Sequence, residues 1–405
     1  MASPLSMVRD RYRDIFDLSG TNLFVPDILC AAYLANSLHR AVERTWLYVV
    51  GRPGSGKTEM VRPFIPLADT VFLNRITDKT LISGFVTGGS KEPSLLPRLD
   101  GKVLLSTDYT SHMGIDPQQA ASIDAVLREA YDGEAAGGFG TGEHKHFTSR
   151  FGVVACVTTD IDYYVLSRRS LGERFVNFWL CSPQNALERR RRANHINHIS
   201  QTIHIWRPEL HALILTAIDF AKKCVPADPA SQCPALPEPT YERMTALADL
   251  CARCRTMPRA TPQNPYQAAM YVDAEDPSRL TKQFATIAWA RAYFDNRDAV
   301  DDSDLDLVAY IALSSMPRFV QIALELMAPR SFASVASIAE TSGLPPQFVT
   351  TVLTQLQRSE ITQCVHKAPV QMWALTPYAK ALIGAGRLPL PQPVASAVVT
   401  AVQSA

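Results

Sequence analysis

The sequence predicts an α/β fold with a mostly parallel sheet, and two observations lead to it. Short apolar runs typical of buried strands lie at 46–50, 70–73, 103–107, 151–158 and 175–180, and helical stretches such as 117–131 separate them. Strands that alternate with helices are typical of a three-layer domain whose sheet is parallel. A glycine-rich segment also follows the first run directly, as it does where a sheet opens onto a phosphate-binding loop.

The chain divides into five segments on this pattern. Residues 1–45 form an amino-terminal extension, in which 1–20 are charged with little regular pattern and 24–41 have the spacing of an amphipathic helix. The α/β core follows at 46–184. A change to helical periodicity over 185–202, 206–224, 240–256 and 278–294 predicts a small helical subdomain, the lid, at 185–315.

The carboxy-terminal unit, 316–387, has its own element order. Helices at 318–328, 334–342 and 346–359 precede strands at 361–365 and 370–375 and a last helix from 377. This order predicts a winged helix-turn-helix. Its third helix, which ends near Arg358, is the expected recognition helix for DNA, although such units also dock proteins. Residues 388–405 carry no charge, and we expect a loose tail.

Composition excludes several classes of protein. The 40 Lys and Arg balance 39 Asp and Glu, which excludes a polybasic coat and requires that any contact with nucleic acid be a local patch. Eight cysteines in 405 residues are too few for a disulfide-built secreted fold. No apolar run reaches the roughly 18 residues of a membrane span. We therefore expect a cytoplasmic protein.

The segment 51–58 matches the phosphate-loop pattern of nucleotide-binding proteins in full. Glycines allow backbone N–H groups to approach phosphate oxygens, and the following helix directs its amino end at them. Lys57 is expected to reach the β- and γ-phosphates of ATP, and the Thr58 hydroxyl to ligate Mg²⁺. The expected nucleotide-binding residues are Gly51, Pro53, Gly54, Ser55, Gly56, Lys57 and Thr58.

A carboxylate at the end of the run 103–107 is the expected second ligand of the metal. Asp108 is placed to enter the Mg²⁺ shell. The next two positions are Tyr109 and Thr110, so no second carboxylate stands beside it to orient an attacking water. Either another acid supplies the base, with Glu129 and Glu173 as the candidates, or hydrolysis is slow.

Taken in order, these motifs resemble the AAA+ ATPases, in particular the motor domain of MCM-type DNA helicases and their shorter bacterial or mobile-element relatives. The resemblance covers about 25–375 and is carried by five segments: 51–58, 94–110, 127–133, 153–160 and 171–175. It implies that Thr158 is the polar sensor at a strand end. It also implies that Arg174 is an arginine finger supplied to a neighbouring subunit, and that Arg279 is a second sensor arginine in the lid.

The resemblance further implies a ring, as in the hexameric family members, and contact with DNA. The segment 137–146 fills the position of a channel-facing hairpin, where Lys145 with His144 and His146 would contact phosphates; a flexible turn is the alternative. The run Arg189–Arg192 is either a solvated helix face or a contact to DNA or another subunit. Cys251 and Cys254 have the spacing of metal ligands, but no second pair accompanies them, which favours packing.

The sequence therefore predicts an oligomeric, DNA-dependent ATPase that acts as a helicase or translocase motor in DNA replication or mobile-element maintenance. Two alternatives stay open. One is an ATP-gated loader that assembles on DNA, passes it to a replication or recruitment partner and turns over slowly. The other is a regulator whose ATPase signals through the winged helix.

Overall fold

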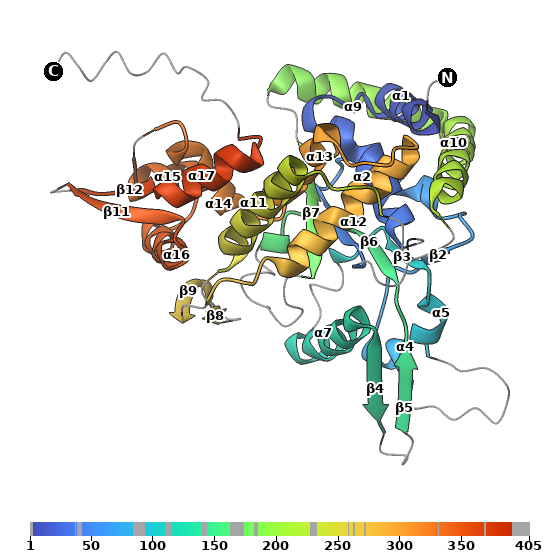
Figure 1. Cartoon of the computed structure of the whole chain (residues 1–405), viewed down its shortest axis with the longest axis horizontal. Coiled ribbons are helices and arrows are strands. Elements are labelled where there is room, and N and C mark those ends of the chain that lie inside the picture. Colours follow the sequence, from blue (N-terminus) through green and yellow to red (C-terminus); the bar gives the residue numbers. More distant parts are fainter. Residues whose placement is uncertain are drawn as a thin grey trace.

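The computed structural model describes residues 3–36, 38, 43–83, 94–110, 116–139, 144–162, 174–181, 185–226, 233–257, 259–261, 264–270, 273–330, 332–367 and 370–390 (Figure 1). A central parallel sheet carries helices on both faces, which confirms the predicted α/β architecture. A hairpin projects from one end of the molecule, and a small carboxy-terminal unit lies to the side of the sheet (Figure 1).

The sheet has five strands in the order β2-β3-β6-β1-β7, and every neighbouring pair is parallel. Trp46 pairs with Val153 on one side and with Phe175 on the other, so three strands start level with one another. Helices bury both faces of such a sheet, which is why its inner strands are mostly apolar. The strands are β1 (Trp46–Val50), β2 (Thr70–Phe72), β3 (Val103–Ser106), β6 (Gly152–Val157) and β7 (Phe175–Trp179).

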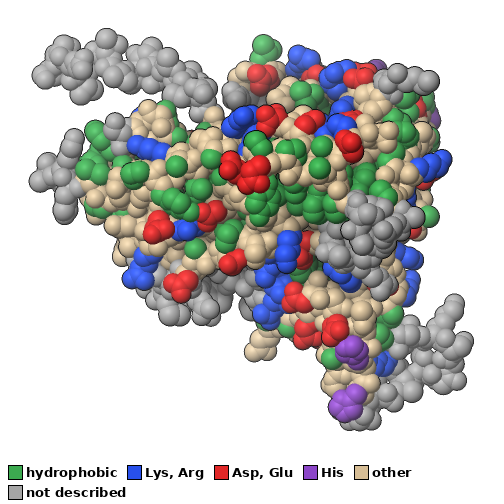
Figure 2. Space-filling model, in the orientation of Figure 1, with side chains coloured by type: hydrophobic (Ala, Val, Ile, Leu, Met, Phe, Trp, Pro, Cys, Tyr) green, Lys and Arg blue, Asp and Glu red, His purple; other side chains and the backbone are tan. Residues whose placement is uncertain are grey.

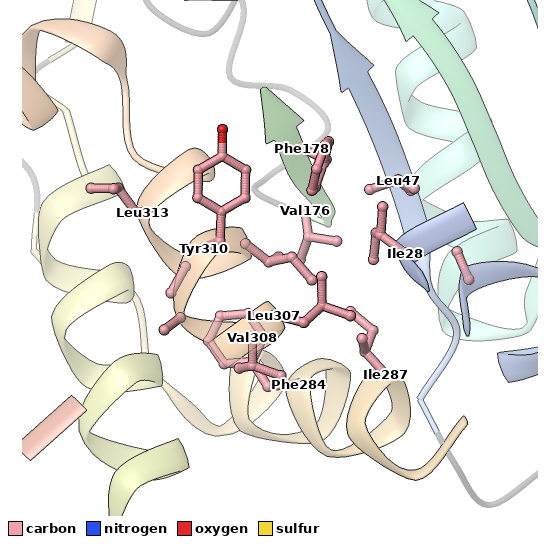
Figure 3. Close-up of a cluster of buried hydrophobic side chains, with 14 of the residues drawn as sticks. Ile28, Leu47, Val176, Phe178, Phe284, Ile287, Leu307, Val308, Tyr310 and Leu313 are labelled. Atoms are coloured by element: carbon pink, nitrogen blue, oxygen red, sulfur yellow. The ribbon is translucent and has the colours of Figure 1, made fainter. Parts of the chain in front are cut away.

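One face of the sheet packs against helices from distant parts of the chain. Side chains of β1 and β7 meet α2, α12 and α13, among them Leu47, Phe178, Ile28, Ile287 and Leu307 (Figure 3). The helices near this face are α1 (Pro4–Phe16), η1 (Gly20–Phe24), α2 (Val25–Ala35), α9 (Ala186–Gln201), α10 (Ile203–Cys224), α11 (Glu238–Arg255), α12 (Ser278–Phe294) and α13 (Asp302–Ser314).

One prediction about these helices is wrong. Residues 1–20 are not irregular, because Leu5, Val8, Tyr12 and Ile15 form a buried stripe along α1 at helical spacing. The predicted lid, 185–315, contributes α10 and α12 to the same continuous core as β1 and β7. Its predicted helices exist, whereas α13 and the hairpin of β8 (Arg259–Thr261) and β9 (Asn264–Met270) were not predicted.

A buried network of charges joins α1, α2, α12 and α13. Arg291 lies between Asp27, at 3.0 Å, and Asp304, and Arg297 also contacts Asp304 at 2.6 Å. Arg9 completes the pairing of Asp27 at 2.6 Å. Both carboxylates are almost fully buried, so each depends on these guanidinium groups for compensation of its charge.

The opposite face of the sheet is covered by α7 (Pro117–Asp132) with the short helices α4 (Asp78–Leu81) and α5 (Leu96–Leu99). Gly133 ends α7 with a φ of 102°, and the chain turns there into a hairpin of β4 (Glu134–Gly138) and β5 (His144–Thr148). This hairpin is a separate two-stranded sheet and extends away from the five-stranded sheet (Figure 1).

The carboxy-terminal unit has the predicted element order, with one additional short strand. It consists of α14 (Arg318–Met327), β10 (Ala333–Ser334), α15 (Val335–Ser342), α16 (Pro346–Arg358), β11 (Thr362–Lys367), β12 (Val370–Leu375) and α17 (Pro377–Gly386), with strand order β10-β12-β11. The predicted tail begins later than 388, because Leu388 is buried; residues 391–405 lie outside the described part.

Several contacts fix this unit to the rest of the molecule. The α17 helix packs on α11, where Arg243 donates to the Gly386 carbonyl and a Cβ at Gly386 would lie 2.8 Å from Leu247 Cδ2. The corner between α13 and α14 covers the edge strand β7, since the Ser315 hydroxyl accepts a 2.9 Å hydrogen bond from the Asn177 N–H.

A loop of the core also contacts this corner. The Asp162 carboxylate, two residues after Asp160, accepts a 3.0 Å hydrogen bond from the Arg318 N–H at the start of α14. Burial raises the pKa of Asp162 to about 7. The turn that follows β6 is thereby joined directly to the carboxy-terminal unit.

No single helix in the described residues is long and apolar enough to cross a membrane. The α13 and α14 helices are apolar when taken together, but they meet at 111° and pack within the core.

Replacement of Asp304 by alanine tests the buried charge network. The change leaves the buried Arg291 and the partly buried Arg297 without their shared carboxylate, and breaking a buried pair in this way costs about 3–5 kcal/mol. We expect that loss in the free energy of unfolding measured in urea. Asp298→Ala, at an exposed position of the same region, is the control; equal effects of the two changes would contradict the assignment.

Candidate nucleotide site

The loop between β1 and α3 (Lys57–Val61) has the backbone that its glycines make possible. Gly54 and Gly56 have φ values of 74° and 83°, which residues with a Cβ rarely adopt. The helix begins directly at Lys57, so its first N–H groups point back toward the loop. The six loop residues therefore form a concave, positively polarised surface that suits a phosphate group.

Position 51 requires glycine for a different reason, because no space is left there for a side chain. A Cβ at this position would lie 2.6 Å from Ser55 Oγ and 3.3 Å from Leu180 Cδ1. The Gly51 N–H also donates to the Val157 carbonyl at 3.1 Å, so the loop starts from the gap between the ends of β6 and β7.

The two side chains expected to hold phosphate and metal lie on this loop. Lys57 Nζ donates to the carbonyls of Gly51 and Arg52, at 3.1 and 3.4 Å, so the ammonium group is folded over the loop. Thr58 Oγ1 donates to the Thr107 carbonyl at 3.4 Å, which brings it to the end of β3. Pro53 and Gly54 form the exposed rim.

Asp108 follows Thr107 and is exposed at the same edge of the sheet. The buried thiol of Cys156 is within electrostatic reach of both Lys57 and Asp108: burial raises its pKa to about 12, Lys57 opposes the rise and Asp108 adds to it. Thr58 and Asp108 offer a hydroxyl and a carboxylate oxygen, the ligands that Mg²⁺ prefers, so the two residues fit the predicted metal.

Thr158 completes this group at the end of β6. Its N–H donates to the Thr110 hydroxyl at 2.9 Å, and its own hydroxyl donates to the Asp160 carboxylate at 2.7 Å. Lys57, Thr58, Asp108 and Thr158 thus meet at the carboxyl edge of the sheet, as predicted. Asp160 was not predicted, although a carboxylate two residues beyond a strand end is the signal that would have indicated it.

Glu129 is not part of this group. It lies near the end of α7, where its carboxylate accepts a 3.2 Å hydrogen bond from the Ala136 N–H of the hairpin. Tyr131, two residues on, packs on Trp46, the first residue of β1. The five residues of β1 span about 16 Å, so the structure does not bring Glu129 to the loop of its own chain. Glu173 lies outside the described residues.

Arg174 and Arg279 lie, like Glu129, at the amino edge of the sheet, which is opposite the edge that carries the phosphate loop. Arg174 precedes β7, contacts Asp132 Oδ2 at 2.8 Å and lies over the Tyr131 ring, 5.5 Å from its centroid. Arg279 contacts Glu275 at 3.5 Å, and its charge opposes the rise that burial causes in the pKa of Tyr131. The structure brings the two predicted arginines to one tyrosine, and neither to the loop of its own chain.

An arginine that was not predicted for this site reaches the phosphate loop instead. Arg192 of α9 donates to the Ser55 carbonyl at 2.9 Å and to the Cys181 carbonyl at 3.4 Å, and burial lowers its pKa. Within the arginine run, Arg189 and Arg190 are exposed. The sequence does indicate that Arg192 faces the protein. It lies three, four and seven residues before His195, Ile196 and Ile199, which form the partly buried side of the helix.

The projecting hairpin carries three of the residues predicted to contact nucleic acid, and it presents them on two opposite faces. His144 and His146 point from one face of β5 and Lys145 from the other, because side chains alternate along a strand. His146 lies 3.7 Å from Glu134 across the hairpin, and histidine side chains mark its exposed end in Figure 2. Arg358 is exposed at the end of α16. Cys251 and Cys254 are buried, as packing requires, and the described residues contain no group of three metal ligands.

Gly51→Ala tests the geometry of the loop. Overpacking against Ser55 Oγ and Leu180 displaces the loop, and we expect the affinity for a fluorescent ATP analogue to fall about ten-fold. Ser55→Ala in the same chain removes the nearest clashing atom, a buried hydroxyl with no hydrogen-bond partner, and should restore part of the affinity. Gly384→Ala, which meets open space, is the control. Unchanged affinity in Gly51→Ala contradicts the assignment.

The chain matches no protein-family model, and no similar sequence is found among curated proteins.

Proposed function

We propose that the chain is an ATPase of the AAA+ type that assembles into a ring and acts on DNA, as MCM-type helicase motors do. The observation that carries this proposal is the division of the expected catalytic groups between two edges of one sheet. The phosphate loop lies at the carboxyl edge, and Arg174 lies at the start of β7, at the amino edge. A complete site therefore requires the amino edge of a second subunit.

The carboxyl edge supplies the groups that hold the nucleotide. Lys57 would neutralise the β- and γ-phosphates, and Thr58 and Asp108 would hold a Mg²⁺ ion that supplies further positive charge. Thr158 and Asp160, joined by a hydrogen bond, are in this proposal the hydroxyl and the carboxylate that orient water at the γ-phosphate. In this proposal the pair, and not Glu129, orients the attacking water.

The amino edge supplies the positive charge that stabilises the transition state. A guanidinium group on the γ-phosphate is worth about 10³ or more in turnover. An interface that joins unlike edges of identical subunits is heterologous, and such interfaces generate a ring when the rotation between subunits closes. Arg279, whose charge acts on Tyr131 as Arg174 does, would be a second positive group supplied from this edge.

Two surfaces are suited to DNA. The hairpin presents Lys145 on one face and the two histidines on the other, and the helices and strands from α14 to α17 follow the order of a winged helix, with Arg358 on α16. Because the net charge is only +1, binding rests on these local patches, and salt should weaken it.

A nucleotide-gated switch is the second candidate, and one observation favours it. Tyr109 occupies the place of a second carboxylate after Asp108 and is buried against Tyr48, so it cannot act on water. Asp160, hydrogen-bonded to Thr158, is then the candidate base. If it does not act as the base, the protein binds ATP and turns over slowly.

ATP turnover without DNA, with single-stranded DNA and with duplex DNA separates the two candidates. A motor predicts turnover that DNA raises several-fold and that Lys57→Ala and Arg174→Ala each abolish. The exposed residues Lys79 and Arg13 provide matched alanine controls that should leave turnover unchanged. ATP binding with negligible turnover under every condition contradicts the motor and supports the switch.

A further inference from the structure

The expected finger, Arg174, is held within its own subunit. Its side chain is only 11% exposed, and its guanidinium group lies between the ring of Tyr131 and the carboxylate of Asp132, 2.8 Å away. In this position the group faces a carboxylate of its own chain. It can bind a neighbour's phosphate only if it exchanges that carboxylate for the phosphate.

The surroundings allow only the tip of the arginine to move. Gln283, fully buried on α12, donates to the Arg174 carbonyl at 2.7 Å and to the Tyr131 hydroxyl at 2.9 Å. Tyr131 also packs edge-on against Trp46. The backbone at Arg174 and the tyrosine ring are thus fixed to the core, whereas the Asp132 side chain is 61% exposed.

Asp132 belongs to the base of the hairpin. It is the last residue of α7, and β4 starts two residues later at Glu134. The Ser149 N–H, just after β5, donates to the Gly133 carbonyl at 3.1 Å, and Glu129 accepts from the Ala136 N–H. A force on the hairpin is therefore transmitted to the residue that holds Arg174.

We infer that Asp132 is a positioning residue that withholds Arg174 from the neighbouring subunit until the hairpin is loaded. This inference rests on the proposed function of Arg174. Displacement of the hairpin by DNA moves Asp132 away from the guanidinium group, and Arg174 then pairs with the phosphates across the interface. The ion pair between Asp132 and Arg174 thereby couples DNA binding to ATP turnover.

Asp132→Asn tests the inference because it removes the charge and leaves the shape. A partly exposed ion pair biases a side-chain position by up to about five-fold, so we expect DNA-free turnover to rise by up to about that factor. The ratio of DNA-stimulated to DNA-free turnover should fall correspondingly, with the KM for ATP unchanged. Asp132→Glu keeps the carboxylate and should retain the ratio of the unmodified protein.

Two further variants make the result specific. Glu134→Gln removes a more exposed carboxylate, 73% accessible, from the same hairpin and should leave DNA-free turnover unchanged. Arg174→Ala combined with Asp132→Asn should abolish the gain. If unmodified protein needs Arg174 for turnover but Asp132→Asn keeps its DNA-free rate and ratio, the inference alone is overturned. Absence of turnover in every variant, with and without DNA, overturns the proposed function and the inference together.

Discussion

Parallel pairing of β1 with β6 on one side and β7 on the other is the constraint on which the rest of the site depends. Because the three strands run in the same direction and start level, the segments that follow β1 and β6 meet at one edge. The segment that precedes β7 must then lie at the other edge. The same pairing that assembles the phosphate loop with Thr158 therefore separates both from Arg174.

The helices on the β1–β7 face hold this arrangement and extend it. The α13 helix, fixed through Arg291 and Asp304, places serine hydroxyls on the outer strand β7, and its corner with α14 meets Asp162. The turn that begins at Thr158 is thereby connected to the carboxy-terminal unit within four residues. At the other edge, Tyr131 connects the hairpin base with Arg174. Both units for which we propose DNA contact thus touch an edge of the sheet.

The sequence was most informative where one local pattern determines the structure. The apolar strands and the loop 51–58 were predicted almost to the residue. An apolar run of this length is typical of a buried strand, and a glycine-rich segment directly after it is typical of a phosphate loop. The order of the carboxy-terminal elements was predicted for the same reason. In α1 the charges of Arg9, Asp10 and Arg11 concealed the buried stripe beneath them, and the irregular segment that we expected is a helix.

Residues whose role depends on tertiary position were harder to place. Arg192 lies in a run of four arginines, and only its helical phase shows that it is the one on the partly buried side. Glu129 and Arg279 were assigned from their positions relative to motifs, whereas the strand order places both beyond the reach of their own loop. That the helical segment shares the core of the sheet follows from long-range packing, which no local pattern reveals.

Mixing two inactive variants tests the central claim, that each site is completed by a second subunit. Lys57→Ala chains keep Arg174, and Arg174→Ala chains keep Lys57, so neither contains a complete set of groups. If the site is shared, an equal mixture should recover about a quarter of the unmodified turnover, because random assembly gives each interface both intact partners at that frequency. No recovery in a mixture whose subunits demonstrably co-assemble would contradict the account.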